Sequence, residues 1–217
     1  LGWVYLNQGR ELDALATFHE VVEHSRGVPA QAALHRAARA DLVRAYAAVG
    51  DVGLALPYFR KVGGGEALMM LERLGDLYRE QGKAPKAISV FRELITLRPR
   101  DHAVCTWQHH VAQATLTIGT APQRVAEIVR LVELYEARRG DAAWPAAAAR
   151  ECRDDAAAMS GELAAAWHAE WSRTRDPALH AAALGLYPVY LRAFRDDPGH
   201  ARAQYYFAEL LWAGAEA

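Results

Sequence analysis

Hydrophobic and small residues recur in a fixed order along the first hundred positions of the chain. A leucine is followed by tyrosine, glycine, alanine and phenylalanine at 4, 8, 13 and 17 positions further on, and this series occurs three times. The copies are Leu1-Tyr5-Gly9-Ala14-Phe18, Leu42-Tyr46-Gly50-Ala55-Phe59 and Leu74-Tyr78-Gly82-Ala87-Phe91. Self-similarity at a period of about 20–50 residues indicates a repeat architecture. We therefore expect a chain built of similar structural repeats.

Each position in the series predicts one feature of a pair of packed helices. Residues four apart lie on one face of a helix, so the leucine and tyrosine share a face of the first helix. The glycine is expected to end that helix in a left-handed conformation, which costs least without a Cβ. The alanine is small because the second helix crosses the first closely there, and the phenylalanine fills the space one turn later. The series thus predicts helix hairpins.

The copies are unevenly spaced, by 41 and then by 32 residues. We place the extra length of the first interval at Gly27–Ala38, where about two additional helical turns would leave the buried face unrotated. The shorter interval contains Gly63-Gly64-Gly65 and predicts a tight connection.

Beyond residue 100 the series weakens but does not disappear. A fourth repeat has Arg124 and Ile128 in place of alanine and phenylalanine, so we expect its helices to cross less closely. A fifth repeat is indicated by Leu186, Tyr190 and Pro198 at the alanine, phenylalanine and terminal proline positions. Residues 205–212 would open a sixth.

The period fails between residues 141 and 173, where we expect one long helix that could be broken near Ser160-Gly161. Leu163, Trp167 and Trp171 form a stripe at intervals of four, interpreted as core, with His168 and Glu170 facing elsewhere. Two segments follow: 1–140, with about four repeats, and 141–217, with the long helix and further repeats continuous with the first segment. Because the pattern begins within a helix at Leu1 and stops within a repeat at Ala217, we expect the natural protein to be longer.

The clearest copy, LGDLYREQGKAPKAISVFRELITLRP from Leu74 to Pro99, resembles the tetratricopeptide repeat (TPR) family. The resemblance is strong over roughly the first hundred residues and weaker afterwards. It implies an all-α fold, an α-solenoid of antiparallel helix hairpins. It also implies a non-catalytic scaffold that docks an extended segment or a helix of a partner protein in a concave groove.

The register of the family places eight side chains on or near that groove. They are Arg44, Glu72, Arg73, Asp76, Arg79, His109, His110 and Gln113. Their mixed signs favour a partner peptide with patterned charge. The Lys/Asn clamp that some TPR domains use for a C-terminal carboxylate is not matched, because Ala40 and Arg44 stand at those positions.

The C-terminal third is similar to a narrower group, the TPR proteins of the bacterial cell envelope associated with gliding motility in myxobacteria. The similarity rests on Trp167-His168, Thr174, Tyr187, Tyr190-Leu191, Phe194, Pro198 and the segment from Tyr206 to Trp212. It implies a scaffold in the periplasm or at the outer membrane. The alternatives are a cytoplasmic protein and a regulatory segment of a larger signalling enzyme such as a bacterial protein kinase.

Composition narrows the possible partners. The chain has 217 residues, 52% of them hydrophobic, and a formal net charge of -1, so it lacks the basic balance of a dedicated nucleic-acid binder. No apolar run approaches the roughly 20 residues needed to span a bilayer. The expected partner is therefore a protein or peptide; the sequence does not indicate an oligomeric state.

Several short motifs suggest chemistry, and each has a simpler interpretation. In HEVVEH the histidines, His19 and His24, are five apart, whereas a helical HExxH zinc site needs a spacing of four. The Gly63–Gly65 run lacks the Lys-Ser/Thr of a P-loop. His109-His110 cannot chelate as a unit, since neighbouring helical residues point about 100° apart. We thus predict no catalytic residue, no metal site and no cofactor.

The two cysteines, Cys105 and Cys152, fall on the first helices of neighbouring repeats. A disulfide between them is geometrically possible in a solenoid. Two buried thiols would instead fit a reducing compartment.

Overall fold

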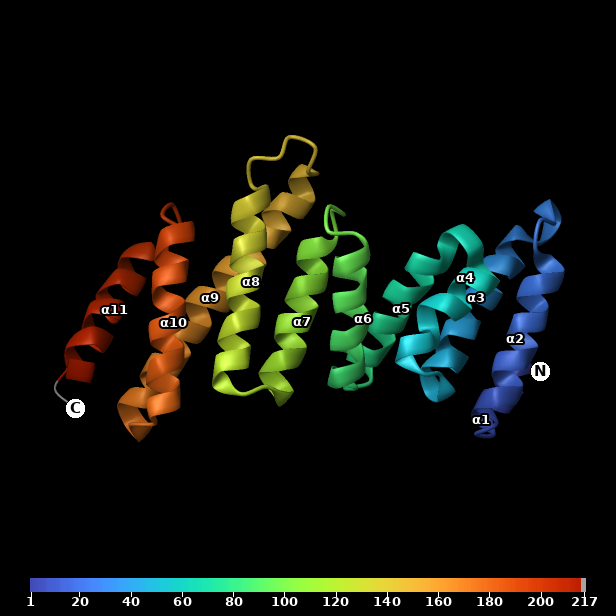
Figure 1. Ribbon diagram of the computed structural model, residues 1–217, viewed down its shortest axis with the longest axis horizontal. Helices are drawn as coiled ribbons and strands as arrows, with labels where there is room; N and C mark the ends of the chain where they lie inside the picture. Colours follow the sequence, from blue (N-terminus) through green and yellow to red (C-terminus); the bar gives the residue numbers. More distant parts are fainter. Residues whose placement is uncertain (216–217) are drawn as a thin grey trace. The chain divides into compact units, whose positions relative to one another are not determined.

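The computed structural model describes residues 1–215, and in this range the chain is all-α, with no strand (Figure 1). The predicted end of the last repeat, at Ala217, lies outside the described residues. The chain divides into two compact units, residues 1–97 and residues 98–217. The boundary predicted at residues 140/141 falls inside the second unit, between two of its helices.

The first unit contains six α-helices joined by short connections. They are α1 (Gly2–Asn7), α2 (Glu11–Ser25), α3 (Ala32–Val49), α4 (Ala55–Gly63), α5 (Ala67–Glu80) and α6 (Ala84–Leu97). Short 3-10 turns precede α3, α4 and α5, at Pro29–Gln31, Val52–Leu54 and Gly64–Glu66. The helices of the hairpins α1–α2 and α5–α6 pack together, and contacts of α2 with α3, α3 with α5 and α4 with α5 join successive hairpins.

The second unit contains α7 (Val104–Ile118), α8 (Ala121–Arg138), α9 (Ala146–Thr174), α10 (Pro177–Ala193) and α11 (His200–Ala215). Each helix contacts the next one, and α7, α8 and α9 also contact α9, α10 and α11 respectively. This pattern, in which every helix meets its two successors, is that of an α-solenoid. Among residues 1–215, no helix combines the length and apolar character that crossing a membrane requires.

The small and large residues of the repeated series lie where the hairpins close. Ala14, Ala55 and Ala87 are completely buried, and the close crossing is confirmed for α1–α2 and α5–α6. For Ala55 it is not confirmed, because the backbones of α3 and α4 scarcely approach each other. In two hairpins the phenylalanine ring of the second helix packs against a glycine of the first helix. A Cβ on Gly75 would lie 2.9 Å from Phe91 Cε1, and a Cβ on Gly2 would lie 2.7 Å from Phe18 Cε1. The bulky ring packs directly against helix backbone.

The predicted left-handed glycines are correct in two repeats and wrong in the third. Gly9 and Gly82 have φ of 69° and 68°. Gly50, in contrast, has φ -74° and ψ 150°, so the chain leaves α3 in an extended conformation. Glycine is required there for a different reason, because a Cβ would collide with the ring of Tyr46. The extra length of the first interval lies where predicted, in the turn at Pro29–Gln31 and in an α3 of 18 residues.

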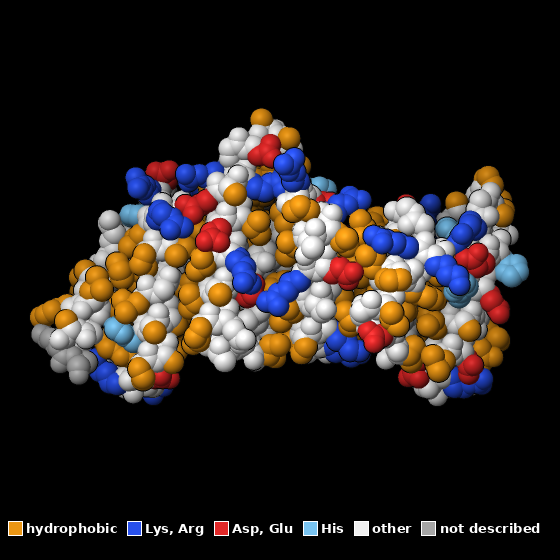
Figure 2. Space-filling view, viewed as in Figure 1, with side chains coloured by type: hydrophobic (Ala, Val, Ile, Leu, Met, Phe, Trp, Pro, Cys, Tyr) orange, Lys and Arg blue, Asp and Glu red, His pale blue; other side chains and the backbone are white. Residues whose placement is uncertain are grey.

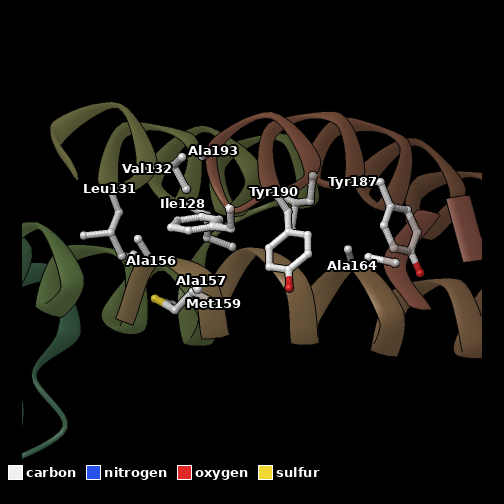
Figure 3. Packing of buried hydrophobic residues seen from close by; sticks show 14 of the residues in the cluster. Ile128, Leu131, Val132, Ala156, Ala157, Met159, Ala164, Tyr187, Tyr190 and Ala193 are labelled. Carbon is white, nitrogen blue, oxygen red and sulfur yellow. The ribbon is translucent and has the colours of Figure 1, made fainter. Parts of the chain in front are cut away.

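The core of the second unit lies between α8, α9 and α10 (Figure 3). Ile128, Leu131 and Val132 of α8 face Ala156 of α9, and Ala193 of α10 belongs to the same cluster. Helix α9 continues without interruption for 29 residues, so the break considered at Ser160-Gly161 is wrong. Ser160 Oγ donates to the carbonyl of Ala156 at 2.6 Å inside the helix, and Gly161 is small because the ring of Tyr190 packs on it.

Candidate functional site

The eight side chains predicted to contact a partner are divided between the two units. Arg44 lies on α3 and Glu72, Arg73, Asp76 and Arg79 lie on α5, whereas His109, His110 and Gln113 lie on α7. The predicted surface therefore consists of two sets, one in each unit. On the face shown in Figure 2, acidic and basic side chains are interspersed and no band of one sign forms.

Arg44 is held in place by its own helix and by an aromatic ring. Its Nη1 donates to Asp41 Oδ1 at 2.9 Å, and its guanidinium carbon lies 5.5 Å from the centre of the Trp3 ring. Trp3 Nε1 donates to Asp41 Oδ2 at 3.0 Å. Asp41 thus bridges Arg44 and Trp3, while the Arg44 side chain remains 42% exposed.

The α5 residues carry charges of both signs at the surface. Arg73 Nη1 lies 3.7 Å from Glu80 Oε1. Burial raises the pKa of the Asp76 carboxyl, and the charges of Arg79 and Arg73 partly oppose that shift. Arg79 is exposed, so this helix presents positive charge next to a carboxylate that is partly shielded from water.

Helices α3 and α5 border a small cavity, here called the α3–α5 pocket, of about 200 Å³. Its lining residues are Arg36, Arg39, Ala40, Val43, Glu66, Met69, Met70 and Arg73. Arg39 Nη2 lies 3.8 Å from Glu66 Oε2. Three guanidinium groups therefore surround an apolar floor, and one carboxylate balances part of their charge.

Sequence reasoning found one residue of this pocket, Arg73, and missed the arginines of α3. A signal for one of them was present. Arg36, Ala40 and Arg44 are spaced four apart and share a face of the helix, so the predicted position of Arg44 also indicated Arg36. No sequence pattern indicated Met69 as a pocket residue. Its side chain is 61% exposed, and this exposure depends on the turn that precedes α5.

In the second unit, α7 is fastened to α9 at two neighbouring points. Cys105 and Cys152 form a disulfide with a Cα–Cα distance of 5.6 Å. One turn further along, His109 Nδ1 lies 2.6 Å from Asp155 Oδ2. The rings of His109 and His110 are 6.0 Å apart, while Gln113 is exposed. His109 is thus part of a helix–helix contact.

Helices α9, α10 and α11 border a larger, open cavity of about 550 Å³, here called the α9–α11 pocket. Small residues of α9, including Ala158 and Gly161, line one wall, and Arg202 and Tyr206 of α11 line the opposite wall. Tyr190 of α10 forms the floor and points toward α9 (Figure 3). None of these positions was predicted as a binding site.

The interpretation of the tryptophan stripe is partly wrong. Trp171 is buried as expected, and Glu170 pairs with Arg173 at the surface. His168, however, is only 6% exposed, and its Nδ1 lies 3.3 Å from Tyr187 Oη. It is buried because α10 and α11 both cover α9 at this level, and the rings of Tyr187 and Tyr206 each lie 6.1 Å from the imidazole.

The histidines of HEVVEH have different partners. His19 Nδ1 lies 3.2 Å from Tyr58 Oη of α4, and His24 Nδ1 lies 2.8 Å from the carbonyl of Glu20 in its own helix. Within residues 1–215, no three His, Cys, Asp or Glu side chains are grouped so that they could hold a metal ion.

Comparison with known families supports the repeat directly for one hairpin. Residues 70–101 match the tetratricopeptide repeat family, a segment that contains most of α5 and all of α6. This hairpin is therefore a tetratricopeptide repeat. No curated protein matches the chain.

Among solved structures, two similar chains are crystal structures of the nearly identical TPR-like repeats of a protein described as a kinesin light chain of Podosopora anserina. One, a variant with a single substitution, is 16% identical with a TM-score of 0.36, and the other is 18% identical with a TM-score of 0.34. Both alignments cover 100% of this chain and 92% of the other. These scores are too low to support a helix-by-helix correspondence.

Proposed function

We propose that this chain, with a tetratricopeptide repeat at its α5–α6 hairpin, is a non-catalytic protein-interaction scaffold. Helical repeat arrays generally present extended surfaces that bind segments of other proteins. In the first unit, the partner segment docks at the α3–α5 pocket, beside the predicted contact residues Arg73, Asp76 and Arg79. The observation that carries the proposal is this pocket, where Arg36, Arg39 and Arg73 surround an apolar floor.

The pocket favours a partner segment with one apolar side chain flanked by carboxylates. A cavity of about 200 Å³ holds a side chain of leucine or phenylalanine size but not a whole ligand. Met69 and Met70 can adapt to its shape, because methionine is unbranched and flexible. The arginines accept carboxylates through paired hydrogen bonds. Arg39 lies near Glu66 and Arg73 lies near Glu80, so we assign the partner's carboxylates to Arg36 and, in exchange for Glu80, to Arg73.

We further propose that the scaffold works in a bacterial envelope complex of the motility or outer-membrane type. The disulfide between Cys105 and Cys152 supports an oxidising compartment such as the periplasm, because disulfides persist there and are rare in the cytosol. The complete gene separates this proposal from a regulatory segment of a signalling kinase. A signal peptide supports the envelope, and kinase motifs support the alternative.

The binding proposal is tested by selecting a phage-displayed library of random twelve-residue peptides on the purified chain. Selected peptides are then measured against wild type, the Arg36→Glu/Arg73→Glu variant and a matched charge reversal elsewhere in the unit, Lys61→Glu. We expect the peptides to pair an apolar residue with Asp or Glu. We expect at least a tenfold loss of affinity in the double variant and little change in Lys61→Glu.

Two outcomes would disprove the α3–α5 site. One is a library from which no peptide is enriched. The other is a set of peptides that bind the double variant as tightly as wild type while its circular dichroism spectrum is unchanged.

A further inference from the structure

The α9–α11 pocket exists because the facing walls carry small side chains. On α9 the wall is formed by Ala157, Ala158, Gly161 and Ala165, and on α11 Ala203 faces it. The resulting volume, about 550 Å³, is within the range of about 300–1,000 Å³ found for ligand sites. It accommodates several residues of a peptide, unlike the smaller pocket of the first unit.

The floor of the pocket is a rigid polar network. Tyr190 is 4% exposed, and its Oη donates to Asp197 Oδ1 at 2.7 Å. The same carboxylate oxygen accepts a hydrogen bond from the backbone N–H of Gly199 at 2.9 Å, and Arg153 Nη2 lies 3.6 Å from Asp197 Oδ2. The floor thus has its hydrogen bonds satisfied before any ligand arrives, and ordering it adds no cost to binding.

Two charges on the pocket walls, by contrast, have no ion-pair partner among residues 1–215. Glu162 stands exposed on α9 and Arg202 stands exposed on α11, and both line the pocket. Asp154 and Asp197, the other charged lining residues, are already paired, since Arg153 Nη1 lies 3.2 Å from Asp154 Oδ1 and Arg153 Nη2 lies 3.6 Å from Asp197 Oδ2. The pocket therefore offers one free carboxylate on one wall and one free guanidinium on the opposite wall.

We propose that the α9–α11 pocket binds a short peptide segment that carries one basic and one acidic side chain. The basic side chain pairs with Glu162, and the acidic side chain pairs with Arg202. An apolar or aromatic residue between them packs on the half-buried ring of Tyr206. The opposed charges also set the direction in which the segment enters, because the reversed segment would place like charges together.

This inference rests on the proposed peptide-binding function but concerns a second site with a different preference. The α3–α5 pocket presents an excess of positive charge, whereas the unpaired charges of this pocket are one carboxylate, Glu162, and one guanidinium, Arg202. The two sites can be separated experimentally by working in the Arg36→Glu/Arg73→Glu background, which removes the first site and leaves the second unit unchanged.

The test uses an array of synthetic ten-residue peptides that carry Lys and Glu one to four residues apart around a central Tyr or Leu. Binding is measured by fluorescence polarisation with Glu162→Gln, Arg202→Gln and Ala158→Trp, each in that background. We expect each neutralising substitution to weaken the best peptides about tenfold, and Ala158→Trp to abolish binding by filling the pocket. Matched neutralisations outside the pocket, Glu151→Gln on α9 and Arg195→Gln before α11, should change the affinity less than twofold.

The pairing itself is tested by a double-mutant cycle. If the peptide lysine contacts Glu162, replacing that lysine by Gln should weaken binding to wild type but have no further effect on Glu162→Gln. The proposal is overturned if no peptide of the array binds, or if bound peptides are insensitive to Glu162→Gln and Arg202→Gln. A preference for peptides with acidic residues only, lost in the Arg36→Glu/Arg73→Glu background, would support the first site alone and disprove this one.

Discussion

The two units close their hairpins in a similar way but fasten neighbouring helices differently. In the first unit the Phe91 ring packs against the backbone at Gly75, and in the second the Tyr190 ring packs against Gly161. Around these contacts, the first unit has hydrogen bonds between helices, such as Trp3 Nε1 to Asp41 Oδ2 at 3.0 Å and His19 Nδ1 with Tyr58 Oη at 3.2 Å. The second unit adds a disulfide and the His109–Asp155 pair between α7 and α9.

The difference follows from what the sequence supplies at the crossings. The first unit has a completely buried alanine in each repeat of the series, and both cysteines of the disulfide lie outside it. The second unit has Arg124 at the alanine position of α8, with a buried Nε atom that has no hydrogen-bond partner in the described part of the chain. The disulfide and the His109–Asp155 pair hold α7 against α9, next to this crossing of α7 and α8. The two units should therefore respond differently to the same perturbation.

The largest difference is expected on removing the disulfide. It closes a loop with a sequence separation of 47, for which chain-entropy arguments give about 4 kcal/mol of stabilisation. We expect a reducing agent, or the Cys105→Ala/Cys152→Ala variant, to destabilise the second unit by an amount of this order. Hydrogen exchange followed by mass spectrometry should show faster exchange in α7 and α9. Peptides from α2 to α6 provide the internal control, and equal acceleration there would contradict the assignment.

The glycine contacts test whether the hairpins close alike in both units. A Cβ on Gly75 would approach Phe91 Cε1 to 2.9 Å, and one on Gly161 would approach Tyr190 Cε2 to 2.8 Å. Because overpacking a dense core typically costs about 1–3 kcal/mol, Gly75→Val and Gly161→Val should each cost about 2 kcal/mol. Chemical denaturation of each variant measures the cost.

Matched controls exist at glycines with open surroundings. A Cβ on Gly65 or on Gly140 would meet nothing within 4 Å, and neither residue has a positive φ. Gly65→Val and Gly140→Val should therefore change the free energy of unfolding by less than about 0.5 kcal/mol. If they cost as much as Gly75→Val, the ring–backbone contact is not the cause.

A smaller effect is expected at the helix N-termini. In the second unit, α8 begins with a capping box between Thr120 and Gln123, and the Asp176 carboxylate accepts the Ala178 N–H at 2.8 Å at the start of α10. The N-cap residues of α2 to α5 in the first unit make no side-chain cap bond. Thr120→Ala and Asp176→Ala should each cost about 1 kcal/mol in denaturant unfolding. Gln31→Ala, at the N-cap of α3, should cost close to nothing; an equal loss there would show that capping does not distinguish the units.

The comparison also explains how far the sequence could predict the structure. The hairpins followed from local spacing, because residues 4, 8, 13 and 17 positions apart meet within one hairpin. The conformation of Gly50 did not follow, since it depends on the Tyr46 ring that occupies the space of a Cβ. His168 was misplaced for a related reason: its burial comes from Tyr187 of α10 and Tyr206 of α11, both on later helices.

Binding positions were less predictable than the fold. Arg36 could be inferred from its spacing to Arg44 on one helix face, but the cavity beside it requires α5 as a second wall. The α9–α11 pocket requires three helices, and no repeat anchor marks Glu162 or Arg202. Local periodicity therefore predicts which helices form, whereas pockets depend on side chains that are distant in the sequence.

The smallest expected difference between the two units is the direction in which their stability changes as the pH falls. In the second unit, burial lowers the pKa of His168, which is surrounded by Trp171, Tyr187, Tyr206 and the charges of Glu209 and His180. A histidine with a depressed folded-state pKa binds its proton more readily when unfolded. Its contribution to stability is therefore complete above pH 6.5, the unperturbed value, and is lost as the pH falls through the folded-state value.

In the first unit the corresponding shift has the opposite sign. Burial raises the pKa of the Asp76 and Glu93 carboxyls, so the folded state binds protons more readily than the unfolded state. As the pH falls toward about 4, these groups should stabilise the first unit while His168 destabilises the second. Hydrogen exchange measured between about pH 7 and pH 4, and corrected for the intrinsic pH dependence of exchange, should show protection decreasing in α9 to α11 and increasing in α5 and α6. His168→Gln should reduce the loss of protection in the second unit, and Asp76→Asn should reduce the gain of protection in the first. Parallel changes of protection in both units would mean that a general charge effect, and not these buried groups, controls the response.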